Sequence, residues 1–507
     1  MAGRHGEAPS AQTETQPSVA RTGPILFALG GDGTSDRIRA LIVRPDGEPA
    51  PLVSTESGDM ASHELASLFG RTLHAIDFSL PSGAVSSYTV AGERFLVTSP
   101  ATPDMRIAYV SCNGQEESDL DRDLSERDIV WQRLADENLD DPFGLLLQGG
   151  DQLYADDVLR CHPEVERWQS LPKTERGSVP LTPDITETLR RFYFDRYLIT
   201  YTRPAFASLA ARVPSIMMWD DHDIIDGWGS HPPEMLDSPV GKALFEAARE
   251  MFLLFQLAAR PGEMPEIVSD KSGTSLGTVV RYPALSVITP DLRSERRLER
   301  VMGNAGWTML DDAFAQTPEG DRILLMSSVP ALGPRLSWAE LAADIIPGTA
   351  EYQDDLRDQW QSRAHRDEWC RMLRLVRDMA RRDGHDLTAL SGEIHLATRA
   401  VMDLGGDRHL NQLVASGIAH RAPPVAWARF LGALATLGDA PLPDHPIRIA
   451  ALPGHRTRYL AERNYLLLTR VGKAWSAQWN LEESGLTPPL PLSRHAGCER
   501  ARHTRLS

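Results

Sequence analysis

Four short apolar runs in this chain are each followed directly by side chains that bind metals or exchange protons. Each run has the length and composition of a buried strand. In an α/β sheet of parallel strands, the residues just past the carboxyl ends of neighbouring strands converge on one crevice. We therefore expect an α/β fold in which the four segments form one site. They are residues 106–110 leading into Ser111-Cys112-Asn113, residues 145–147 leading into Gly149-Gly150-Asp151-Gln152-Leu153-Tyr154, residues 215–219 leading into Asp220-Asp221-His222-Asp223, and residues 387–390 leading into Ser391-Gly392-Glu393-Ile394-His395.

The size and charge of the chain exclude several classes of protein. A chain of 507 residues, 42% hydrophobic and 24% charged, is long enough for more than one domain. Its formal charge of -17 argues against a wide basic surface for nucleic acids. The four cysteines lie far apart in no zinc-finger spacing, which favours a reducing compartment. Neither a membrane-spanning run, a signal-peptide core nor a twin-Arg pair is found, so we expect a cytoplasmic location.

The pattern along the chain predicts four segments. A polar N-terminus precedes short β-type runs separated by turn residues, and strands then alternate with helices in what the strand count indicates is a two-sheet α/β core. The predicted segments are a disordered N-terminus (1–22), a small antiparallel β domain (23–103), the α/β domain (104–483) and a basic flexible tail (484–507). Predicted local elements include a hairpin between residues 87–90 and 94–98 and helices at about 128–138, 187–201 and 366–382.

Two of the four clusters have readings both as structure and as chemistry. Gly149 and Gly150 permit a sharp turn that would aim the Asp151 carboxylate off the strand end, although such turns also occur as plain structure. The phenol of Tyr154 is a good ligand for a hard trivalent ion, or else a half-buried core side chain. Cys112 offers either a thiolate to a metal or a small buried apolar group.

The third cluster is harder to explain as solvated surface, and the fourth again has two readings. Residues 220–223 place three carboxylates and an imidazole between apolar runs. Such a group is costly to bury unless a cation neutralises it or its pKa values rise. Glu393 and His395 are two residues apart, so in extended backbone both side chains point the same way. The alternative for this pair is a capping carboxylate beside a satisfied core histidine.

Taken together, these segments resemble the PhoD-like (alkaline phosphatase D type) metallophosphatases of the calcineurin-like superfamily. The resemblance extends in order from about residue 106 to 483 and includes the motif Asp291-Leu292-Arg293-Ser294 and residues 412–416. It implies a four-layer α/β/β/α sandwich preceded by a small antiparallel β domain. It also implies a two-metal centre that hydrolyses phosphate esters, with a small phosphate ester as substrate.

The resemblance also implies roles for single residues. Asp151 would bridge both ions, and Asp221 stands where the superfamily has the asparagine of a Gly-Asn-His-Glu signature. His222 matches the proton donor of that signature, acting directly or with Asp223. Arg293 is a candidate phosphate clamp, or else one arginine of a basic surface run.

The implied ligand set departs from the wider superfamily. Cys112 and Tyr154 resemble the iron ligands of this branch, in place of an absent first Asp-x-His motif. His395 matches a family histidine, whereas Glu393 stands where the family more often has Asp. The Gly-His-x-His motif is missing. The implied cofactors are two metal ions, iron plus calcium, with manganese, zinc and magnesium as alternatives.

Two other functions stay open at this point. One is a catalytically weak metal-binding or interaction protein on the same fold, although the chain keeps both Asp151 and His222, of which a degenerate member would be expected to lose one. The other is a phosphodiesterase acting on lipid or nucleotide diesters. The sequence does not choose between monoesters and diesters.

Overall fold

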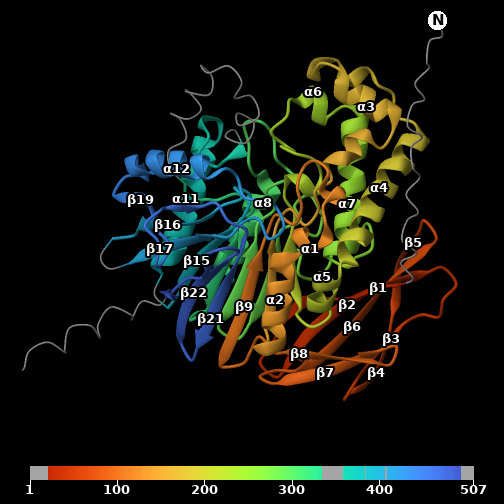
Figure 1. Ribbon diagram of the computed structural model, residues 1–507, viewed down its shortest axis with the longest axis horizontal. Helices are drawn as coiled ribbons and strands as arrows, with labels where there is room; N and C mark the ends of the chain where they lie inside the picture. The colour runs from red at the N-terminus through yellow and green to blue at the C-terminus, as the bar shows by residue number, and fades with distance from the viewer. Residues whose placement is uncertain (1–20, 334–357, 383, 406–407, 493–507) are drawn as a thin grey trace, which may run out of the picture.

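The computed structural model describes residues 21–333, 358–382, 384–405 and 408–492 (Figure 1). This part of the chain has a mixed α/β architecture with three sheets. Within it, no helix combines the length and the apolar character needed to cross a bilayer.

The first sheet has eleven strands, ordered β23-β22-β21-β9-β10-β11-β1-β2-β6-β5, with β24 paired to β22. At its centre β9, β10 and β11 run parallel to one another. Its strands are β1 (Thr22–Gly31), β2 (Ser35–Pro45), β5 (His63–Leu68), β6 (Arg71–Pro81), β9 (Asp104–Val110), β10 (Leu145–Gly149), β11 (Ser215–Met218), β21 (Asn464–Val471), β22 (Ala474–Leu481), β23 (Gly485–Leu486) and β24 (Leu490–Pro491).

The second sheet has nine strands, ordered β12-β13-β14-β15-β17-β16-β19-β18, with β20 paired to β16. In it, β13, β14, β15 and β17 are parallel neighbours. Its strands are β12 (Thr278–Tyr282), β13 (Leu285–Thr289), β14 (Arg322–Met326), β15 (Asp386–Ser391), β16 (Ala397–Asp403), β17 (His409–Val414), β18 (Asp439–Leu442), β19 (His445–Ala450) and β20 (Tyr459–Leu460).

Alternation of side chains along the strands builds separate apolar layers on the two faces of each sheet. Ile107 and Tyr109 of β9 pack in one cluster with Leu324 and Met326 of β14, so this cluster lies between the two sheets. Ala108 points the other way and packs with the helices that cover the first sheet.

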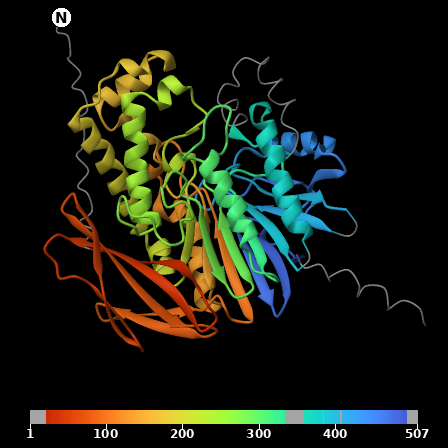
Figure 2. The ribbon, with the colours of Figure 1, turned by 180° about the vertical axis from the view of Figure 1, so that it is seen from behind.

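The helices cover the outer faces of the two sheets. Residues of α2, α4, α5 and α7 pack on the first sheet, and residues of α8, α11 and α12 pack on the second. Accordingly α2 faces the viewer in Figure 1 and α8 in Figure 2. The helices are α1 (Leu124–Arg127), α2 (Ile129–Asp140), α3 (Pro163–Ser170), α4 (Pro183–Tyr201), α5 (Pro204–Ala210), α6 (Pro233–Leu236), α7 (Pro239–Gln256), α8 (Asn304–Ala315), α11 (Arg366–Arg381) and α12 (Val425–Leu434).

The local elements that the sequence predicts are confirmed. The three predicted helices correspond to α2, α4 and α11, and α4 begins a few residues early because the Thr182 side chain caps it with Pro183 at its first position. The predicted hairpin is β7 (Val85–Val90) with β8 (Glu93–Thr98). Its turn residues Ala91 and Gly92 both have positive φ, as a two-residue hairpin turn requires.

The predicted β domain at 23–103 does not form a sheet system of its own. β1 pairs in parallel with β11, joining Phe27 to Ser215, and β2, β6 and β5 continue the first sheet outward. Only β3 (Leu52–Thr55), β4 (Gly58–Ala61), β7 and β8 form a separate four-stranded sheet, which packs on the strands beside it. The local pattern predicts several of these strands, but not β3, β4 and β5 and not the long-range pairing.

The predicted terminal segments are also revised. The tail was expected from residue 484, but β23 and β24 both pair with β22, so the ordered sheet extends further along the chain. Residues 1–20 and 493–507 lie outside the described residues, and the predicted disorder of both termini stays a prediction there.

Candidate metal and catalytic centre

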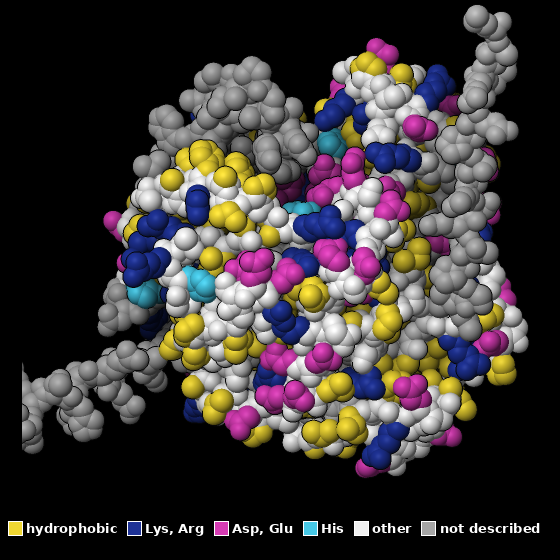
Figure 3. Space-filling view, viewed as in Figure 1, with side chains coloured by type: hydrophobic (Ala, Val, Ile, Leu, Met, Phe, Trp, Pro, Cys, Tyr) yellow, Lys and Arg dark blue, Asp and Glu magenta, His cyan; other side chains and the backbone are white. Residues whose placement is uncertain are grey.

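The carboxyl ends of the parallel strands in both sheets meet at one place, as the sequence predicts. Ser328, just after β14, donates a hydrogen bond to Asp220 Oδ1, just after β11, at 2.8 Å. The Ser111 hydroxyl, after β9, donates to the carbonyl of Ala415, after β17, at 3.0 Å. Each of these bonds joins one sheet to the other. Figure 3 shows acidic side chains gathered on the upper half of this face of the molecule, with histidine side chains beside them.

The backbone at this meeting point is unusually constrained. Cys112, Asp151, Glu393 and His395 all have φ between 53° and 64°, the left-handed region that residues other than glycine seldom adopt. Gly150 has a φ of 108°, and a Cβ there would lie 2.8 Å from the Cβ of Asp220. Backbone strain of this kind clusters at functional sites, where the surrounding structure holds it in place.

One group of possible metal ligands consists of Cys112, Asp151 and His395, whose ligand atoms lie within 4.8 Å of one another. The thiol of Cys112 lies 3.3 Å from Asp151 Oδ2 and 3.1 Å from the Ser416 hydroxyl. Burial raises the pKa of this thiol well above its ordinary value, and the Asp151 carboxylate adds to the effect. A cation would reverse this effect, because a coordinated thiol is deprotonated.

A second group consists of Asp151, Asp220 and Asp221, all buried and again within 4.8 Å of one another. Burial and the neighbouring charges of Asp220 and Asp221 raise the pKa of Asp151. Burial likewise raises the pKa of Asp220 to about 6, although Arg293 opposes this.

Two carboxylate oxygens of the second group have no hydrogen-bond partner among the described residues, as expected where a metal ion would bind. Asp151 Oδ1 and Asp220 Oδ2 are buried and have no hydrogen-bond partner among the described residues. Three carboxylates at such short range repel one another unless a cation lies among them. Oxygen, nitrogen and sulfur donors with unfilled capacity suit metal ions. Because Asp151 belongs to both groups, its carboxylate can supply an oxygen ligand to a metal ion in each group.

His222 is held in one orientation beside these groups. Its Nδ1 lies 2.9 Å from Asp156 Oδ2, and the Tyr154 ring stacks on it with the ring centroids 4.3 Å apart. Burial opposes protonation of His222, yet the carboxylates of Asp156 and Asp221 together raise its pKa well above 6.5. These carboxylates favour the protonated imidazole, whose Nε2 carries the proton that it can donate.

Tyr154 and His395 form a cluster with His420 and Glu116. The Tyr154 hydroxyl lies 2.8 Å from His395 Nε2, and the rings of His395 and His420 stack with their centroids 3.4 Å apart. Both carboxylate oxygens of Glu116 lie 3.1 Å from His420 Nε2. Burial and the neighbouring His420 lower the pKa of His395 well below 6.5, which leaves its imidazole neutral and able to act as a ligand.

Two predicted catalytic residues occupy other positions than expected. Asp223 points away from the cluster and accepts hydrogen bonds from the backbone of Leu153 and Asp220 and from the Gln256 side chain. Arg293 is fully buried rather than on the surface. Its guanidinium bonds Asp220, Asp221 and Asp358 and leaves little capacity to clamp a phosphate.

Glu393 also makes a different contact. Both oxygens of its carboxylate accept hydrogen bonds from the Gln359 amide, at 2.6 and 2.7 Å. It belongs to neither ligand group described above, whereas His395 belongs to the first. Burial raises the pKa of Glu393 well above 4.5, and the charge of Asp358 acts in the same direction.

Four residues of this centre were not assigned from the sequence: Glu116, Asp156, Asp220 and His420. All four follow the carboxyl end of a central strand, so extending the strand-end argument a few residues further would have included them. Asp156 begins a short 3-10 helix and His420 lies in a loop, and the local pattern predicts the course of neither segment. Asp220 belongs to the predicted cluster of residues 220–223, but the resemblance implies the ligand role for its neighbour Asp221.

Comparisons with known proteins identify a family and related folds. A family model described as PhoD related phosphatase matches residues 86–349, just over half of the chain. An uncharacterized protein of Saccharomyces cerevisiae is 25% identical over 422 residues, covering 67% of this chain and 60% of the yeast protein. The chain thus matches less than two thirds of the length of that relative.

Solved structures include similar folds. PhoD superimposes with a TM-score of 0.57 at 13% identity, over 94% of this chain and 93% of that structure. A dimetal phosphatase from Danio rerio gives a TM-score of 0.35 at 10% identity, over 77% of this chain and 99% of that structure. The likeness to PhoD shows the fold, and the family match extends across three of the four strand-end clusters. The chain belongs to the PhoD-related phosphatase family.

Proposed function

We propose that this protein is a metal-dependent hydrolase of phosphate esters, either a phosphomonoesterase or a phosphodiesterase of the alkaline phosphatase D type. Family membership supports the phosphatase class. The observation that carries metal dependence is the position of Asp151, which is shared by two ligand groups and has a buried, unpartnered oxygen. The fold proposed with this function is the four-layer α/β/β/α sandwich, supported by the cluster between the sheets and the helices outside them.

The residues that would hold two ions differ in chemistry. Cys112, Asp151 and His395 combine sulfur, oxygen and nitrogen donors, which suit iron or zinc. Asp151, Asp220 and Asp221 offer oxygen alone, which suits calcium, magnesium or manganese. When bound, such cations supply the positive charge that activates water and the phosphoryl oxygens.

The protein residues have separate tasks in this proposal. His222, oriented by Asp156 and with its protonated form favoured by that carboxylate, gives its Nε2 proton to the departing alkoxide. Arg293 acts as a positioning residue, because it fixes the carboxylates of Asp220 and Asp221 in the second ligand group. Asp223 ties the loop that follows β11 to the loop that follows β10.

A paired assay tests this function. The purified protein should hydrolyse p-nitrophenyl phosphate or bis-p-nitrophenyl phosphate, and a chelator should abolish turnover until metal is restored. The ratio of the two rates would assign the monoester or diester class. Absence of turnover with iron, calcium, manganese, zinc and magnesium on both esters would overturn the proposal in favour of a metal-binding or interaction protein.

A further inference from the structure

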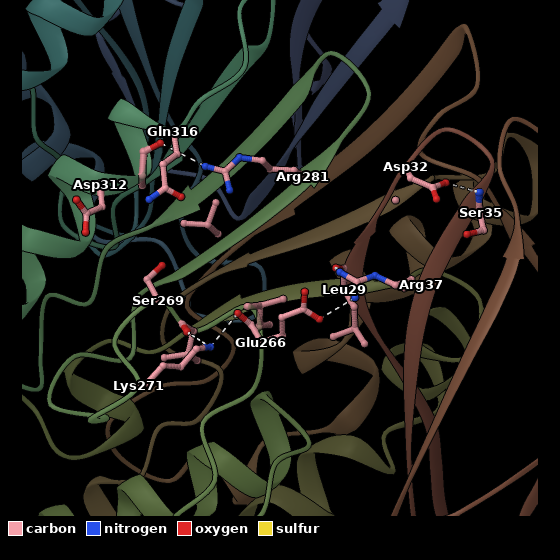
Figure 4. Close-up of a pocket in the computed structure, with 15 residues that line it drawn as sticks. Leu29, Asp32, Ser35, Arg37, Glu266, Ser269, Lys271, Arg281, Asp312 and Gln316 are labelled. Atoms are coloured by element: carbon pink, nitrogen blue, oxygen red, sulfur yellow. Dashed lines mark hydrogen bonds and ion pairs between the residues drawn. The ribbon is translucent and has the colours of Figure 1, made fainter.

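A cavity lies away from the candidate centre, at the seam between the two sheets (Figure 4). Its volume is about 580 Å³, within the size range of small-molecule sites. We call it the seam cavity. Its walls are β1, the β1–β2 turn, β2, the loop of residues 266–271, β12 and the carboxyl end of α8. Its polar lining includes Arg37, Lys271, Arg281, Asp312 and Gln316.

The seam cavity is at the opposite end of the second sheet from the candidate centre. In the antiparallel pair, Arg281 of β12 lies opposite Ser286, near the start of β13. The loop with Asp291 and Arg293 follows the other end of that strand. Five residues at about 3.3 Å each separate the two ends by roughly 16 Å. The cavity is therefore distinct from the ligand groups around Asp151.

Close backbone packing forms the wall of this cavity. Gly30 of β1 has a φ of 96°, and a Cβ there would lie 2.7 Å from the carbonyl oxygen of Arg281. A side chain at this position would push β12 away from β1. The glycine therefore keeps the two sheets in contact beside the cavity, so that its shape is preformed.

Two of its three cationic side chains are already occupied. The Lys271 ammonium donates to three carbonyl oxygens, those of Pro265, Glu266 and Val268, which use all of its N–H groups. Arg37 bonds Glu266 and the carbonyl of Leu29. Neither side chain needs a ligand to satisfy its charge.

Arg281 differs from these two. Its guanidinium makes one long hydrogen bond, to the carbonyl of Ala313 at 3.4 Å, and its buried Nε has no partner among the described residues. No ion pair joins it to a carboxylate within the described chain. Burial lowers its pKa, with Asp321 opposing this from a distance. Figure 4 shows its side chain pointing toward Gln316, with Asp312 beyond.

We propose that the seam cavity binds a small metabolite that carries a carboxylate or phosphate group, held by Arg281. A planar guanidinium with unused N–H groups recognises such oxyanions by paired hydrogen bonds. Asp312 and Gln316 at the end of α8 provide acceptors for hydroxyl or amine groups of the same molecule. The inference does not depend on the activity proposed above, because no residue of the candidate centre lines this cavity.

Calorimetric titration of the whole protein with two probes tests this binding and separates the two sources of the oxyanion. Succinate represents carboxylates and inorganic phosphate represents phosphates. At least one should bind saturably to the wild type and to the Asp151→Ala variant, because the seam cavity does not use Asp151. Arg281→Gln should weaken that binding about tenfold or more, as expected when charged hydrogen bonds are lost, and should leave ester hydrolysis unchanged.

Matched variants make the result decisive. Arg399→Gln removes another arginine whose buried Nε lacks a partner, on β16 and outside the cavity, and should leave binding unchanged. If Arg281→Gln fails to fold by circular dichroism, Gln316→Ala at the exposed end of α8 should still weaken binding. Absence of saturable binding of both probes at millimolar concentration, or equal binding by all variants, would overturn the proposal.

Discussion

Replacement of Asp156 by Asn should separate the charge of this residue from its shape. In the wild type, Asp156 Oδ2 lies 2.9 Å from His222 Nδ1, and Oδ1 accepts the backbone N–H of Asp226 at 2.7 Å. Asn has the same size, and its one carbonyl oxygen can keep the bond to the backbone. The variant should therefore fold and retain metal, since Asp156 belongs to neither ligand group around Asp151.

The expected effect on His222 can be worked out from this contact. The two side chains are 9% and 14% exposed, so solvent screens the pair only weakly. A hydrogen bond to a charged group contributes about 1.5–3 kcal/mol. Loss of the Asp156 charge therefore lowers the pKa of His222, because that carboxylate favours the protonated imidazole. Because His222 donates its proton only when protonated, activity falls as pH rises through this pKa.

The alkaline limb of the pH profile of kcat should thus move to lower pH in Asp156→Asn, because the limb follows the pKa of His222. At neutral pH, kcat should fall by about 10-fold to 100-fold, the usual effect of losing a residue that orients a catalytic group. Asp157→Asn is the matched control, since Asp157 pairs with Arg196 and does not contact His222. A fall in kcat without movement of the limb, or equal loss in both variants, would refute this account of His222.

Four further predictions concern the centre itself. Asp151→Ala should lose metal and activity together while the fold survives, as checked by elemental analysis, rate and circular dichroism; normal metal content would disprove the shared-ligand role. His222→Ala should lower kcat by about 10² to 10⁴ and keep its metal, whereas loss of metal would make His222 a ligand. If iron is bound, the protein should be coloured, Tyr154→Phe should remove or shift the visible band, and Cys112→Ser should weaken iron retention; a colourless, fully active protein would exclude iron and leave the two-metal hydrolase standing. Arg293→Met should reduce the free energy of unfolding in urea by about 3–5 kcal/mol, because it leaves buried carboxylates without their partner; a loss below about 1 kcal/mol, the value of an exposed ion pair, would show that Arg293 is not needed for the network.

The sequence alone determined the elements of the core and the chemistry of the centre. Apolar runs and helical periodicity are properties of near neighbours, so α2, α4, α11 and the β7–β8 hairpin follow from local pattern. The rule that parallel strands end at one edge is enough to predict that Cys112, Asp151, His222 and His395 lie near one another.

Only the tertiary structure decided which atoms meet. Whether Asp220 or Asp221 bonds Arg293 depends on partners far away in the chain, and the structure shows that both do. The burial of Arg293 and the pairing of β1 with β11 also depend on partners that are distant in the sequence. Cys112 and His395 adopt left-handed backbone, against the local preference of residues other than glycine. Contacts between residues distant in sequence carry no local signal, because their energy arises only when both sheets have formed.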